Sequence, residues 1–537
     1  MLLKYLITQG GNNFTLKKEF RKKVVALVLF GGFFLPIGFL ILKSFFYGTD
    51  SLNYILENLL FEYSINTLKL ILITCIFSII FGVFPAWYVS NYKFFGRSII
   101  DLLLLLPLAV PTYIMAFSYS EILSFTGPFK ITVDLIQPEI LGILLSFSLF
   151  PYIYSASRIS FSLLGERYQE ISKNLGINKT KYFFTVVIPL SKPALFSGLF
   201  LVIMEVLNEY GAVKYFGVNT YTIGIFRAWN SMNDTGAAIQ LSSILLFIVS
   251  FLFFLEKSFN KNKRFSSAKN SSVNKLMKTK ILKKILIYIF CLTPIIFAFI
   301  IPVVFNLVNL IDDFQSIEFL NLFRLTINSI SVSLFTSIFV VLISILFLYG
   351  ERQSKSRLYY YINEFISLGY SIPGAVVALS IIIFFTSIDS NLAKISILGG
   401  FLVYLFMLIY AYIIRFMAVG KTTLKAGFDK LPNSYDNTAK VLGLSDFNFF
   451  KKVLFPLNKL PLLSALILVF IDIMKELPIT LILRPFNFDT LATQTFEFAI
   501  DEMIPKSAIY SLSIILICSL LLVLFKKLLD RLHVSGD

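Results

Sequence analysis

The sequence of 537 residues contains little charge, little cysteine and almost no histidine. Charged residues make up 15% of it, against about 25% in soluble globular domains, and this excludes an ordinary soluble protein. The three cysteines, Cys75, Cys291 and Cys518, each lie inside an apolar run, and the one histidine is His533 in the C-terminal tail. These positions exclude a disulfide framework and a Cys/His zinc site.

Long apolar runs take the place of charge. Hydrophobic residues make up 57% of the chain, in runs of about 20 residues that are long enough to cross a bilayer as helices. The sequence therefore predicts an all-α polytopic membrane protein with about 12 transmembrane helices. Pro107, Pro111 and Pro373 interrupt or begin two of the runs and predict kinks there, unless packing alone accommodates them. The expected spans are Val24–Phe46, Ile65–Tyr88, Ile99–Tyr119, Ile140–Ala156, Ala194–Val213, Ala237–Leu255, Ile285–Leu307, Ile327–Leu348, Phe365–Phe385, Ile397–Phe416, Leu462–Leu481 and Ile509–Phe525.

The positive charge is unevenly placed along the chain. Lys and Arg exceed Asp and Glu by 48 to 31, a net charge of +17, which in a soluble protein would suggest nucleic-acid binding. With the N-terminus in the cytoplasm, 38 of the 48 Lys and Arg fall in segments on the cytoplasmic side and 7 in the opposite loops. This asymmetry predicts that both termini are cytoplasmic, and it accounts for the net charge without nucleic acid.

A polar and basic segment from Glu256 to Lys284 separates two halves that repeat one another. The clearest match joins the segments that start at Tyr168 and Tyr435, which read YQEISKNLGINKTKYFFTVVIPL and YDNTAKVLGLSDFNFFKKVLFPL at an offset of 267 residues. Two upstream matches pair INTLKL with INSISV and VPTYIMAF with IPGAVVAL, both at an offset of 262. The common order predicts a duplication into parallel repeats, related by an axis along the membrane normal, with a pathway between them.

The longest of these matches is a loop between spans four and five that recurs between spans ten and eleven, on the cytoplasmic side. Each copy predicts a short helix, a break at Gly176 or Gly443, and a second helix that ends at Pro189 or Pro456. Such a projecting pair of helices suits docking onto a soluble partner. An amphipathic loop at the membrane interface is the alternative, which the duplication at one topological place disfavours.

The loops resemble the EAA motif, E-A-A-x-x-x-G with a downstream proline, of the permease subunits of binding-protein-dependent ABC importers. The first copy reads EISKNLG from Glu170 and the second reads NTAKVLG from Asn437, so the leading glutamate is present only in the first copy. The resemblance covers about residues 61–255 and 323–527. It implies tandem duplicated type I ABC importer permease domains, of the MetI-like kind, in which each loop is a coupling helix seated in a cleft of an ATPase subunit. The coupling residues that it implies are Tyr168, Glu170, Gly176, Pro189, Tyr435, Asn437, Gly443 and Pro456.

The repeat and the resemblance together predict the order of the parts along the chain. The expected order is a cytoplasmic N-terminus with the first transmembrane helix (1–60), a first permease domain (61–257) with its coupling loop (168–190), a basic cytoplasmic linker (258–284), the seventh transmembrane helix with an outer loop (285–322), and a second permease domain (323–537) with its coupling loop (435–457). The resemblance places the whole chain in a bacterial inner membrane, surrounded by lipid.

The resemblance also implies partners. ATP hydrolysis is expected in separate ATPase subunits, two copies of one protein that bind ATP and Mg, and a periplasmic binding protein is expected to deliver the cargo. This chain itself is expected to bind no cofactor and not to be an enzyme. The closest approach to the pattern G-x-x-x-x-G-K-[ST] is Gly420-Lys421-Thr422, which has Arg415 where the first glycine belongs.

Three further segments resemble the fused-permease branch that moves ferric iron. They begin at Leu106, Glu205 and Met474 and read LPLAVPTYIMAFSY, EVLNEYGAVKYFGVNTYTIGIFRAW and MKELPITLILRPFNFDTLAT. Ferric iron is therefore the implied cargo, while permeases for thiamine, phosphonate, sulfate or polyamines share the general plan and stay open as alternatives. An ion-driven secondary transporter with two parallel six-span halves fits the same hydropathy, but it does not predict the repeated loops.

Two pairs of acids, each four residues apart, lie at matching places in spans five and eleven. The spacing predicts one helix face for each pair, and acids within spans usually face a polar interior. Carboxylates suit a hard cation such as ferric iron, although no metal site is firmly predicted. Hydrogen bonding or ion pairing inside the membrane, with Lys475 as a counterion, is the alternative. The candidate pathway residues are Glu205, Glu209, Tyr210, Asp472 and Glu476.

Overall fold

A computed structural model describes residues 30–46, 50–124, 127, 130, 137–260, 276–277, 281–353, 357–388, 397–432 and 434–534. Over these residues the regular structure is helical, apart from one isolated bridge between Tyr92 and Met277. The predicted all-α class is confirmed. Most of the predicted linker and of the predicted N-terminal segment lies outside the described residues.

Within the described residues, eight helices are long and apolar enough to cross a membrane by themselves. Three further spans each consist of two helices that meet at a bend, which brings the count to as many as eleven, and a shorter apolar helix, Phe30–Ser44, lies within the first expected span. The prediction of about 12 membrane helices is therefore matched only when the bent and the short helices are included. The eight are Leu60–Asn91, Pro138–Leu163, Lys179–Asn208, Thr235–Phe259, Ile281–Asp312, Phe319–Gln353, Gly399–Phe428 and Ile504–Leu528, and the bent pairs are Arg97–Ala109 with Thr112–Leu123, Phe365–Ser371 with Gly374–Ile388, and Phe450–Leu457 with Lys459–Met474.

The third and ninth expected spans are broken rather than straight. Their two arms meet at 92° in the third span and at 113° in the ninth. The residues at the breaks, Val110 and Ile372, have extended ψ angles of 109° and 126°, because a following proline disfavours the helical conformation. The kinks predicted at Pro111 and Pro373 are confirmed, and they are sharp enough to turn the chain.

The chain folds into two compact units that do not coincide with the two halves of the sequence. We call them the first-half unit and the second-half unit, after the half that supplies most of each. Two helices, α15 (Phe319–Gln353) and α25 (Ile504–Val534), contribute to both. Among the described residues, the first-half unit comprises those within 47–327 and 489–523, and the second-half unit comprises those within 30–46, 328–488 and 524–534.

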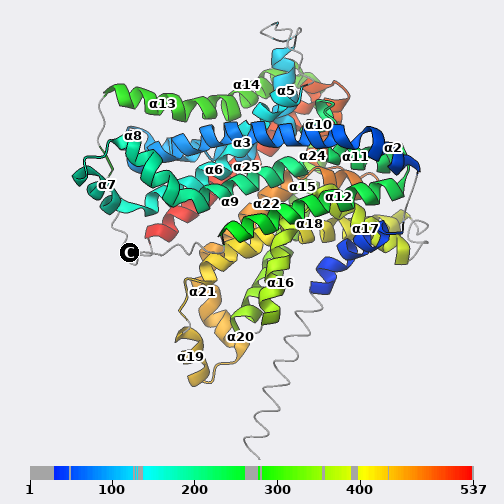
Figure 1. Cartoon of the computed structure of the whole chain (residues 1–537). Coiled ribbons are helices and arrows are strands. Elements are labelled where there is room, and N and C mark those ends of the chain that lie inside the picture. The colour runs from blue at the N-terminus through cyan, green and yellow to red at the C-terminus, as the bar shows by residue number, and fades with distance from the viewer. Residues whose placement is uncertain are drawn as a thin grey trace, which may run out of the picture. The chain divides into compact units, whose positions relative to one another are not determined.

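In the first-half unit, α3 packs along α6 and α9. Glycines allow this close approach, because a Cβ at Gly82 would lie 2.9 Å from Ile153, and one at Gly142 would lie 2.9 Å from Ile73. The helix α13 runs beside α3 (Figure 1). The elements are α2 (Asp50–Asn58), α3 (Leu60–Asn91), α4 (Arg97–Leu103), η1 (Leu106–Ala109), α5 (Thr112–Leu123), α6 (Pro138–Leu163), α7 (Gly165–Asn174), α8 (Lys179–Tyr182), η2 (Phe183–Val187), α9 (Ile188–Asn208), α10 (Gly211–Tyr215), α11 (Tyr221–Phe226), η3 (Arg227–Ser231), α12 (Thr235–Asn260), α13 (Ile281–Ile295), η4 (Ile296–Ile300), α14 (Ile301–Asp312), η5 (Phe314–Ser316), the first part of α15, α24 (Leu491–Ile500) and most of α25.

In the second-half unit, α18 packs against α22 and α17. The N-terminal helix Phe30–Ser44 belongs to this unit, since the rings of Phe30 and Phe34 each lie 5.8 Å from the ring of Phe365. The elements after the N-terminal helix are the rest of α15, α16 (Arg357–Leu368), η6 (Gly369–Ser371), α17 (Gly374–Ile388), α18 (Ile397–Phe428), α19 (Ser434–Val441), α20 (Asp446–Phe449), η8 (Phe450–Leu454), α21 (Phe455–Leu457), α22 (Lys459–Met474) and α23 (Pro478–Leu483).

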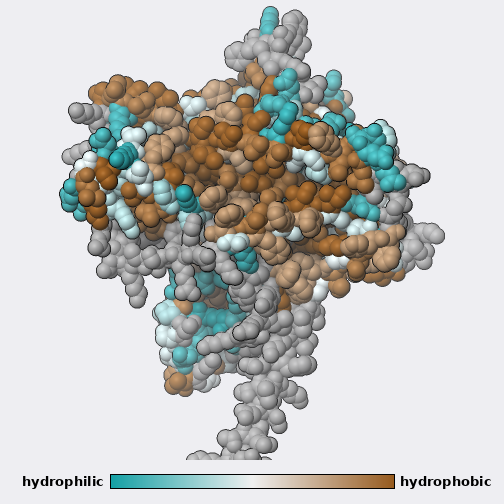
Figure 2. Space-filling view, viewed as in Figure 1, coloured by the Kyte–Doolittle hydropathy of each residue, from teal (hydrophilic) through white to brown (hydrophobic). Residues whose placement is uncertain are grey.

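The surface of the first-half unit is that of a protein in lipid. Figure 2 shows apolar side chains over the visible face of α3 and α13 and polar side chains near α7 and α2, at the two ends of α3. Along α3, Leu68, Leu72 and Ile76 recur every fourth residue and are all more than half exposed. A continuous exposed apolar face of this length indicates contact with hydrocarbon rather than with water.

Candidate functional site

The two repeated loops break at glycine as predicted. Gly176 has a φ of +67° and Gly443 a φ of +65°, left-handed values that glycine adopts without the steric cost of a Cβ. Each glycine follows a short helix, α7 or α19, and the next N–H donates to the carbonyl oxygen five residues back. This Schellman arrangement satisfies carbonyl groups at the helix end. The two hydrogen bonds are Ile177 N to Ser172 O at 2.9 Å and Leu444 N to Ala439 O at 3.0 Å.

The second helix of each loop does not end at proline, and this part of the prediction is wrong. The first copy continues unbroken through Pro189 into span five, and the second breaks at Asn458, two residues past Pro456. In both copies a π-helical turn, Phe183–Val187 or Phe450–Leu454, precedes the proline. In a π-helical turn the backbone hydrogen bonds join residues five apart instead of four. This shift accommodates a proline, which has no N–H to donate, without ending the helix.

Both loops expose apolar side chains around the glycine. Leu175 is 70% exposed and Leu442 is 69% exposed, and each directly precedes its left-handed glycine. Tyr168 and Tyr435 are nearly half exposed at the start of the loops. We call these four residues the coupling surface. Apolar groups exposed on an otherwise polar, projecting segment indicate a surface that binds another protein.

Each loop is tied to a core helix of its own half by a polar side-chain pair, which we call the loop anchor. In the first loop, buried Gln169 donates through Nε2 to Oδ1 of Asn91, at the end of α3, over 3.0 Å. In the second loop, Oδ2 of Asp436 accepts from Nε of Arg352 at 2.8 Å and from its Nη2 at 2.6 Å. Gln169 and Asp436 occupy equivalent positions, 267 residues apart. One half therefore anchors its loop with neutral amides and the other with an ion pair.

An aromatic contact accompanies each anchor, again at equivalent positions. The rings of Trp87 and Phe183 lie 5.0 Å apart in the first half, and those of Tyr349 and Phe450 lie 6.2 Å apart in the second. Aromatic pairs at such distances add to the stabilisation from burial. Each loop is thus attached to one end of its core helix, α3 or α15, at two points, one polar and one aromatic, so a motion of the loop would move that helix.

The first pair of acids does not share one helix face, contrary to the prediction. The helix α9 contains Glu205 but ends at Asn208, and Glu209 is extended with a ψ of 127°. Its carboxylate turns toward the next short helix, where Oε1 accepts from the N–H of Ala212 at 2.9 Å and Oε2 accepts from the hydroxyl of Thr112 at 2.6 Å. The side chain therefore satisfies a backbone group at the break, which explains why the helix can end there.

The second pair of acids does not share one helix face either, because α22 ends at Met474 between Asp472 and Glu476, and both acids form ion pairs. Beyond the end of α22, Oε1 of Glu476 accepts from the N–H of Ile479 at 3.3 Å and lies 3.1 Å from Nη1 of Arg415. Both side chains of this ion pair are only 6% exposed. Asp472 pairs with Lys475 at 3.6 Å. The ion pairing that the sequence left open as an alternative is thus present in the second half, with a partner for Glu476 that was not expected.

The helix ends beside Glu209 and Glu476 are built alike, except for the group that contacts the carboxylate. Thr112 and Gly374 are equivalent residues of the repeat, 262 apart. A Cβ at Gly374 would collide with Nη1 of Arg415 and would lie 2.7 Å from Oε1 of Glu476. The missing side chain therefore makes room for the guanidinium. A threonine hydroxyl meets the carboxylate of Glu209 in the first half, and an arginine meets the equivalent carboxylate in the second.

The remaining candidates are placed as follows. Tyr210 is buried, its ring stacks on that of Phe226 at 3.7 Å, and the ring of Phe496 lies 6.1 Å away. Glu205 is partly exposed. Among the described residues, no group of three or more His, Cys, Asp or Glu side chains could hold a metal ion. The acids are divided between the units, with Glu205 and Glu209 in one and Asp472 and Glu476 in the other.

The tripeptide Gly420-Lys421-Thr422 lies inside the helix α18. Lys421 is buried, and its Nζ donates to Oγ of Ser367 at 3.1 Å and to the carbonyl oxygen of Asn363. A phosphate-binding loop offers free backbone N–H groups, whereas those of a helix interior bond to carbonyl groups of the same helix. The geometry therefore agrees with the reading that this tripeptide binds no nucleotide.

Sequence reasoning missed the anchor residues Gln169, Asp436 and Arg352 and the buried Arg415. A signal for the anchors exists, because the residue after each loop tyrosine is polar in both copies. A signal for Arg415 exists as well, since it falls next to the end of an expected span, where a charge needs a partner. Neither signal names the partner, which lies on another helix.

Comparison with known proteins extends these observations. The chain matches the family described as binding-protein-dependent transport system inner membrane component twice, over residues 78–265 and 347–534. It is 26% identical over 504 residues to the Fe(3+)-transport system permease protein FbpB 2 of Haemophilus influenzae, covering 92% of this chain and 95% of the relative. It is 29% identical over 188 residues to the sulfate transport system permease protein CysT of Salmonella typhimurium, covering 34% of this chain and 62% of the relative.

A further relative is the probable sulfate transport system permease protein cysT of Marchantia polymorpha, 26% identical over 271 residues, which covers 47% of this chain and 92% of the relative. The double match confirms the predicted tandem duplication, since each half of the sequence contains one copy. The apolar helices agree with an inner-membrane location. The chain therefore belongs to the family of binding-protein-dependent transport system inner membrane components, as a multi-pass permease with two such domains in tandem.

Proposed function

We propose that this chain is the permease subunit of an ABC importer and forms the translocation pathway for ferric iron delivered by a periplasmic binding protein. The observation that carries the importer proposal is the duplicated loop. Each copy has the same left-handed glycine and an exposed leucine before it, at equivalent positions. Two equal docking elements suit two copies of one ATPase subunit, which bind ATP and Mg and supply the energy.

Ferric iron is proposed because the similarity to the Fe(3+)-transport permease extends over 92% of this chain and 95% of that protein. The matches to the two sulfate permeases extend over 34% and 47% of this chain. Thiamine, phosphonate and sulfate therefore become the alternative cargoes to test. An ion-driven secondary transporter has no use for the coupling surface, and its distinguishing result would be uptake without ATP.

The loops are proposed to transmit the closure of the ATPase pair to the membrane. On this proposal the coupling residues named above face the ATPase, and the termini and loops are cytoplasmic. ATP binding moves the loops, the anchors at Asn91 and Arg352 carry that motion to α3 and α15, and the pathway turns from open inside to open outside. Cargo released by the binding protein then enters from the other side.

The acids at the helix breaks are proposed to line the pathway, together with Tyr210. Ferric iron is a hard cation that prefers oxygen ligands. In the second half, the ion pairs of Asp472 and Glu476 hold the break in shape, so we propose that contact with the ion falls to Glu205 and Glu209. The side chains of Glu205 and Glu209 are partly exposed, whereas that of Glu476 is buried.

Reconstitution tests the proposal directly. The chain is placed in liposomes with its candidate ATPase and binding protein, and uptake of radiolabelled ferric iron is compared with that of thiamine, a phosphonate and sulfate. Iron uptake that needs ATP and all three proteins is the expected result, and Glu209→Gln is expected to slow iron uptake while leaving basal ATPase activity unchanged. Uptake of another cargo would refute the substrate, and uptake driven by an ion gradient without ATP would refute the importer.

Loss of a loop anchor is expected to uncouple ATP hydrolysis from transport. Asp436→Ala removes both charge-assisted hydrogen bonds from Arg352, so the loop can still bind the ATPase but no longer holds α15 firmly. Coupling free energies between sites are typically 1–3 kcal/mol, and iron transported per ATP hydrolysed is expected to fall by about fivefold or more. The two rates are measured in the same liposomes.

The matched control for this anchor is Asp429→Ala, which removes an exposed acid just ahead of the same loop. It is expected to leave the ratio of iron to ATP unchanged. A merely structural role of Asp436 would lower the amount of folded complex, and both rates would fall together at a constant ratio. An unchanged ratio in Asp436→Ala therefore contradicts the anchor role.

A further inference from the structure

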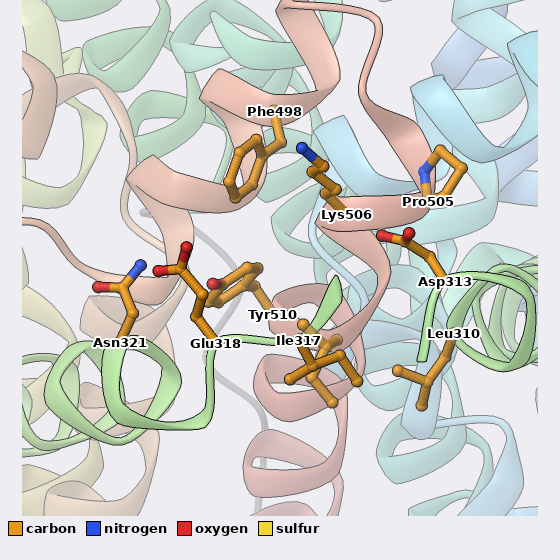
Figure 3. Close-up of a pocket in the computed structure, with 10 residues that line it drawn as sticks. Leu310, Asp313, Ile317, Glu318, Asn321, Phe498, Pro505, Lys506 and Tyr510 are labelled. Carbon is orange, nitrogen blue, oxygen red and sulfur yellow. The ribbon is translucent and has the colours of Figure 1, made fainter. Parts of the chain in front are cut away.

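A polar pocket of about 180 Å³ lies at one end of the first-half unit, among the ends of α14, α15, α24 and α25. Figure 3 shows Glu318, Asn321 and Tyr510 gathered on one side of it and Lys506 and Asp313 on the other. The pocket therefore presents a cation and two carboxylates to the same small space. Nothing in the proposed transport mechanism uses it, since it is formed by the connections after α14 and before α25.

An apolar groove of about 580 Å³ adjoins this pocket, because Leu310 and Ile509 line both. It runs between α14, α15 and α25, and most of its lining side chains are apolar. Two residues that line it, Leu516 and Leu520, are about 60% exposed, so the groove opens sideways toward the surface that faces hydrocarbon. It is accessible from the bilayer rather than from water.

The level of the pocket along the helices matches the boundary of the membrane. Asp313 follows the last residue of α14, and Lys506 lies in the first turn of α25, both of which belong to membrane spans. A polar pocket at the end of two spans, continuous with an apolar groove along them, fits a molecule with a polar head and an apolar chain. The order of the two cavities is that of a lipid headgroup above its acyl chain.

The charged side chains of the pocket determine which lipid headgroup it can bind. We infer that the pocket and groove bind a zwitterionic phospholipid with a primary ammonium group, phosphatidylethanolamine, whose phosphate lies against Lys506 and whose ammonium lies between Asp313 and Glu318. An ammonium has N–H groups to donate to carboxylates. The trimethylammonium of phosphatidylcholine has none, and a headgroup with negative charge alone would meet two carboxylates of like sign.

Selectivity must come from the headgroup pocket rather than from the groove. Acyl chains in a bilayer are already in surroundings as apolar as leucine side chains, so moving a chain into the groove gains little free energy. The groove decides whether a lipid is held beside the helices, and the pocket decides which lipid it is. The two cavities therefore predict separable effects of substitution.

The test counts the lipids that remain on the protein. The full chain is placed in nanodiscs of equimolar phosphatidylethanolamine and phosphatidylcholine of one acyl composition, and the lipids retained after gentle release are measured by native mass spectrometry. The wild-type chain is expected to retain about fivefold more phosphatidylethanolamine, because its ammonium can donate hydrogen bonds to the carboxylates that a trimethylammonium cannot form. Asp313→Asn with Glu318→Gln is expected to bring the ratio toward parity, whereas Lys506→Gln removes the contact with the phosphate that both lipids share and is expected to lower retention of both at an unchanged ratio.

Two controls distinguish a built site from ordinary lipid contact. Lys527→Gln removes an exposed lysine at the other end of α25 and is expected to keep the preference, while Leu516→Trp fills the groove and is expected to lower retention of both lipids at an unchanged ratio. Equal retention of the two lipids by the wild-type chain would overturn the inference. A full preference in the variant that lacks both carboxylates, measured on protein that elutes as a single species, would overturn it as well.

Discussion

Replacing Arg415 by methionine is expected to lower the free energy of unfolding of the chain by about 3–5 kcal/mol, the cost of leaving one member of a buried ion pair without its partner. The guanidinium and the carboxylate of Glu476 lie 3.1 Å apart and are each 6% exposed. Methionine has a similar length but no charge, so Glu476 keeps its carboxylate in apolar surroundings. Unfolding by sodium dodecyl sulfate, followed by circular dichroism in mixed micelles, measures the difference.

The matched control is Lys425→Met on the same helix, where the pair with Glu351 is 3.3 Å long but 40% and 27% exposed. An exposed pair contributes about 0–1 kcal/mol, so this variant is expected to unfold nearly as the wild type does. A loss of stability in Arg415→Met that is no larger than in Lys425→Met would refute the buried ion pair.

The repeat supplies a rescue for the arginine variant. Gly374→Thr alone is expected to destabilise the chain, because its Cβ would collide with Arg415. In the Arg415→Met background the same change is expected to restore about 1–2 kcal/mol, since the hydroxyl can donate to Glu476 as that of Thr112 donates to Glu209. An effect of the same sign in both backgrounds would contradict the equivalence of the two breaks.

The spans and the duplication were predictable because bilayer thickness and backbone hydrogen bonding leave few choices for an apolar run of that length. The partners of the spans were not. The helix Phe30–Ser44 begins the first half of the sequence but packs in the second-half unit, and α13 begins the second half but packs along α3. Hydropathy indicates that a helix needs apolar neighbours but not which helices these are. The packing of each of these two helices with the other half of the sequence is therefore seen only in the structure.

The parts of the candidate site that depend on a backbone conformation favoured by one residue type were predictable. A glycine at the same register of both loops pointed to a left-handed turn, and both glycines have it. The helix ends beside the acids were harder to predict. Glu209 follows a segment with good helical periodicity, and its own contacts with Thr112 and Ala212 stabilise the break. Such a contact joins residues nearly a hundred positions apart, beyond the reach of local patterns.

The same limit concealed Arg415. The expected span Ile397–Phe416 ends one residue after Arg415, whereas α18 continues to Phe428, so hydropathy places this residue at the edge of the membrane and does not indicate a partner inside the helix bundle. Within α18, the charge of Arg415 has a structural role. It pairs with Glu476 and contributes to the fold of the second half rather than to the orientation of the chain.

The two halves perform equivalent tasks with different chemistry. In the first half, a pair of neutral amides, Gln169 with Asn91, anchors the loop, and the neutral hydroxyl of Thr112 donates to the carboxylate of Glu209 at the break. In the second half, an ion pair stands at each of the two places. Charged pairs in partly buried surroundings respond to substitution more strongly than neutral hydrogen bonds. Equivalent substitutions are therefore expected to affect the second half more, although the ATPase subunits that meet the two loops are proposed to be identical.

The largest effect on transport is expected from the coupling surface. Leu175→Asp together with Leu442→Asp places a charge where each loop is proposed to enter an apolar cleft of the ATPase. Burial of one leucine side chain contributes about 1.5–3 kcal/mol, so the affinity for the ATPase is expected to fall about tenfold or more at each loop. Binding of the purified ATPase to the chain in nanodiscs gives the affinity, and liposomes give ATP-driven uptake, which is expected to be lost.

The matched control is Phe486→Asp, which places the same charge on an 87% exposed apolar residue in the loop after α23. That loop is predicted to lie on the opposite side of the membrane, so the ATPase affinity is expected to be unchanged.

The single variants test whether the two loops bind the ATPase independently. If Leu175→Asp and Leu442→Asp each weaken binding and together abolish it, both loops dock independently on the ATPase pair, as the duplication predicts. Full affinity and normal uptake in the double variant would show that the exposed leucines face something other than an ATPase, and the proposed route from ATP to the pathway would have to be abandoned.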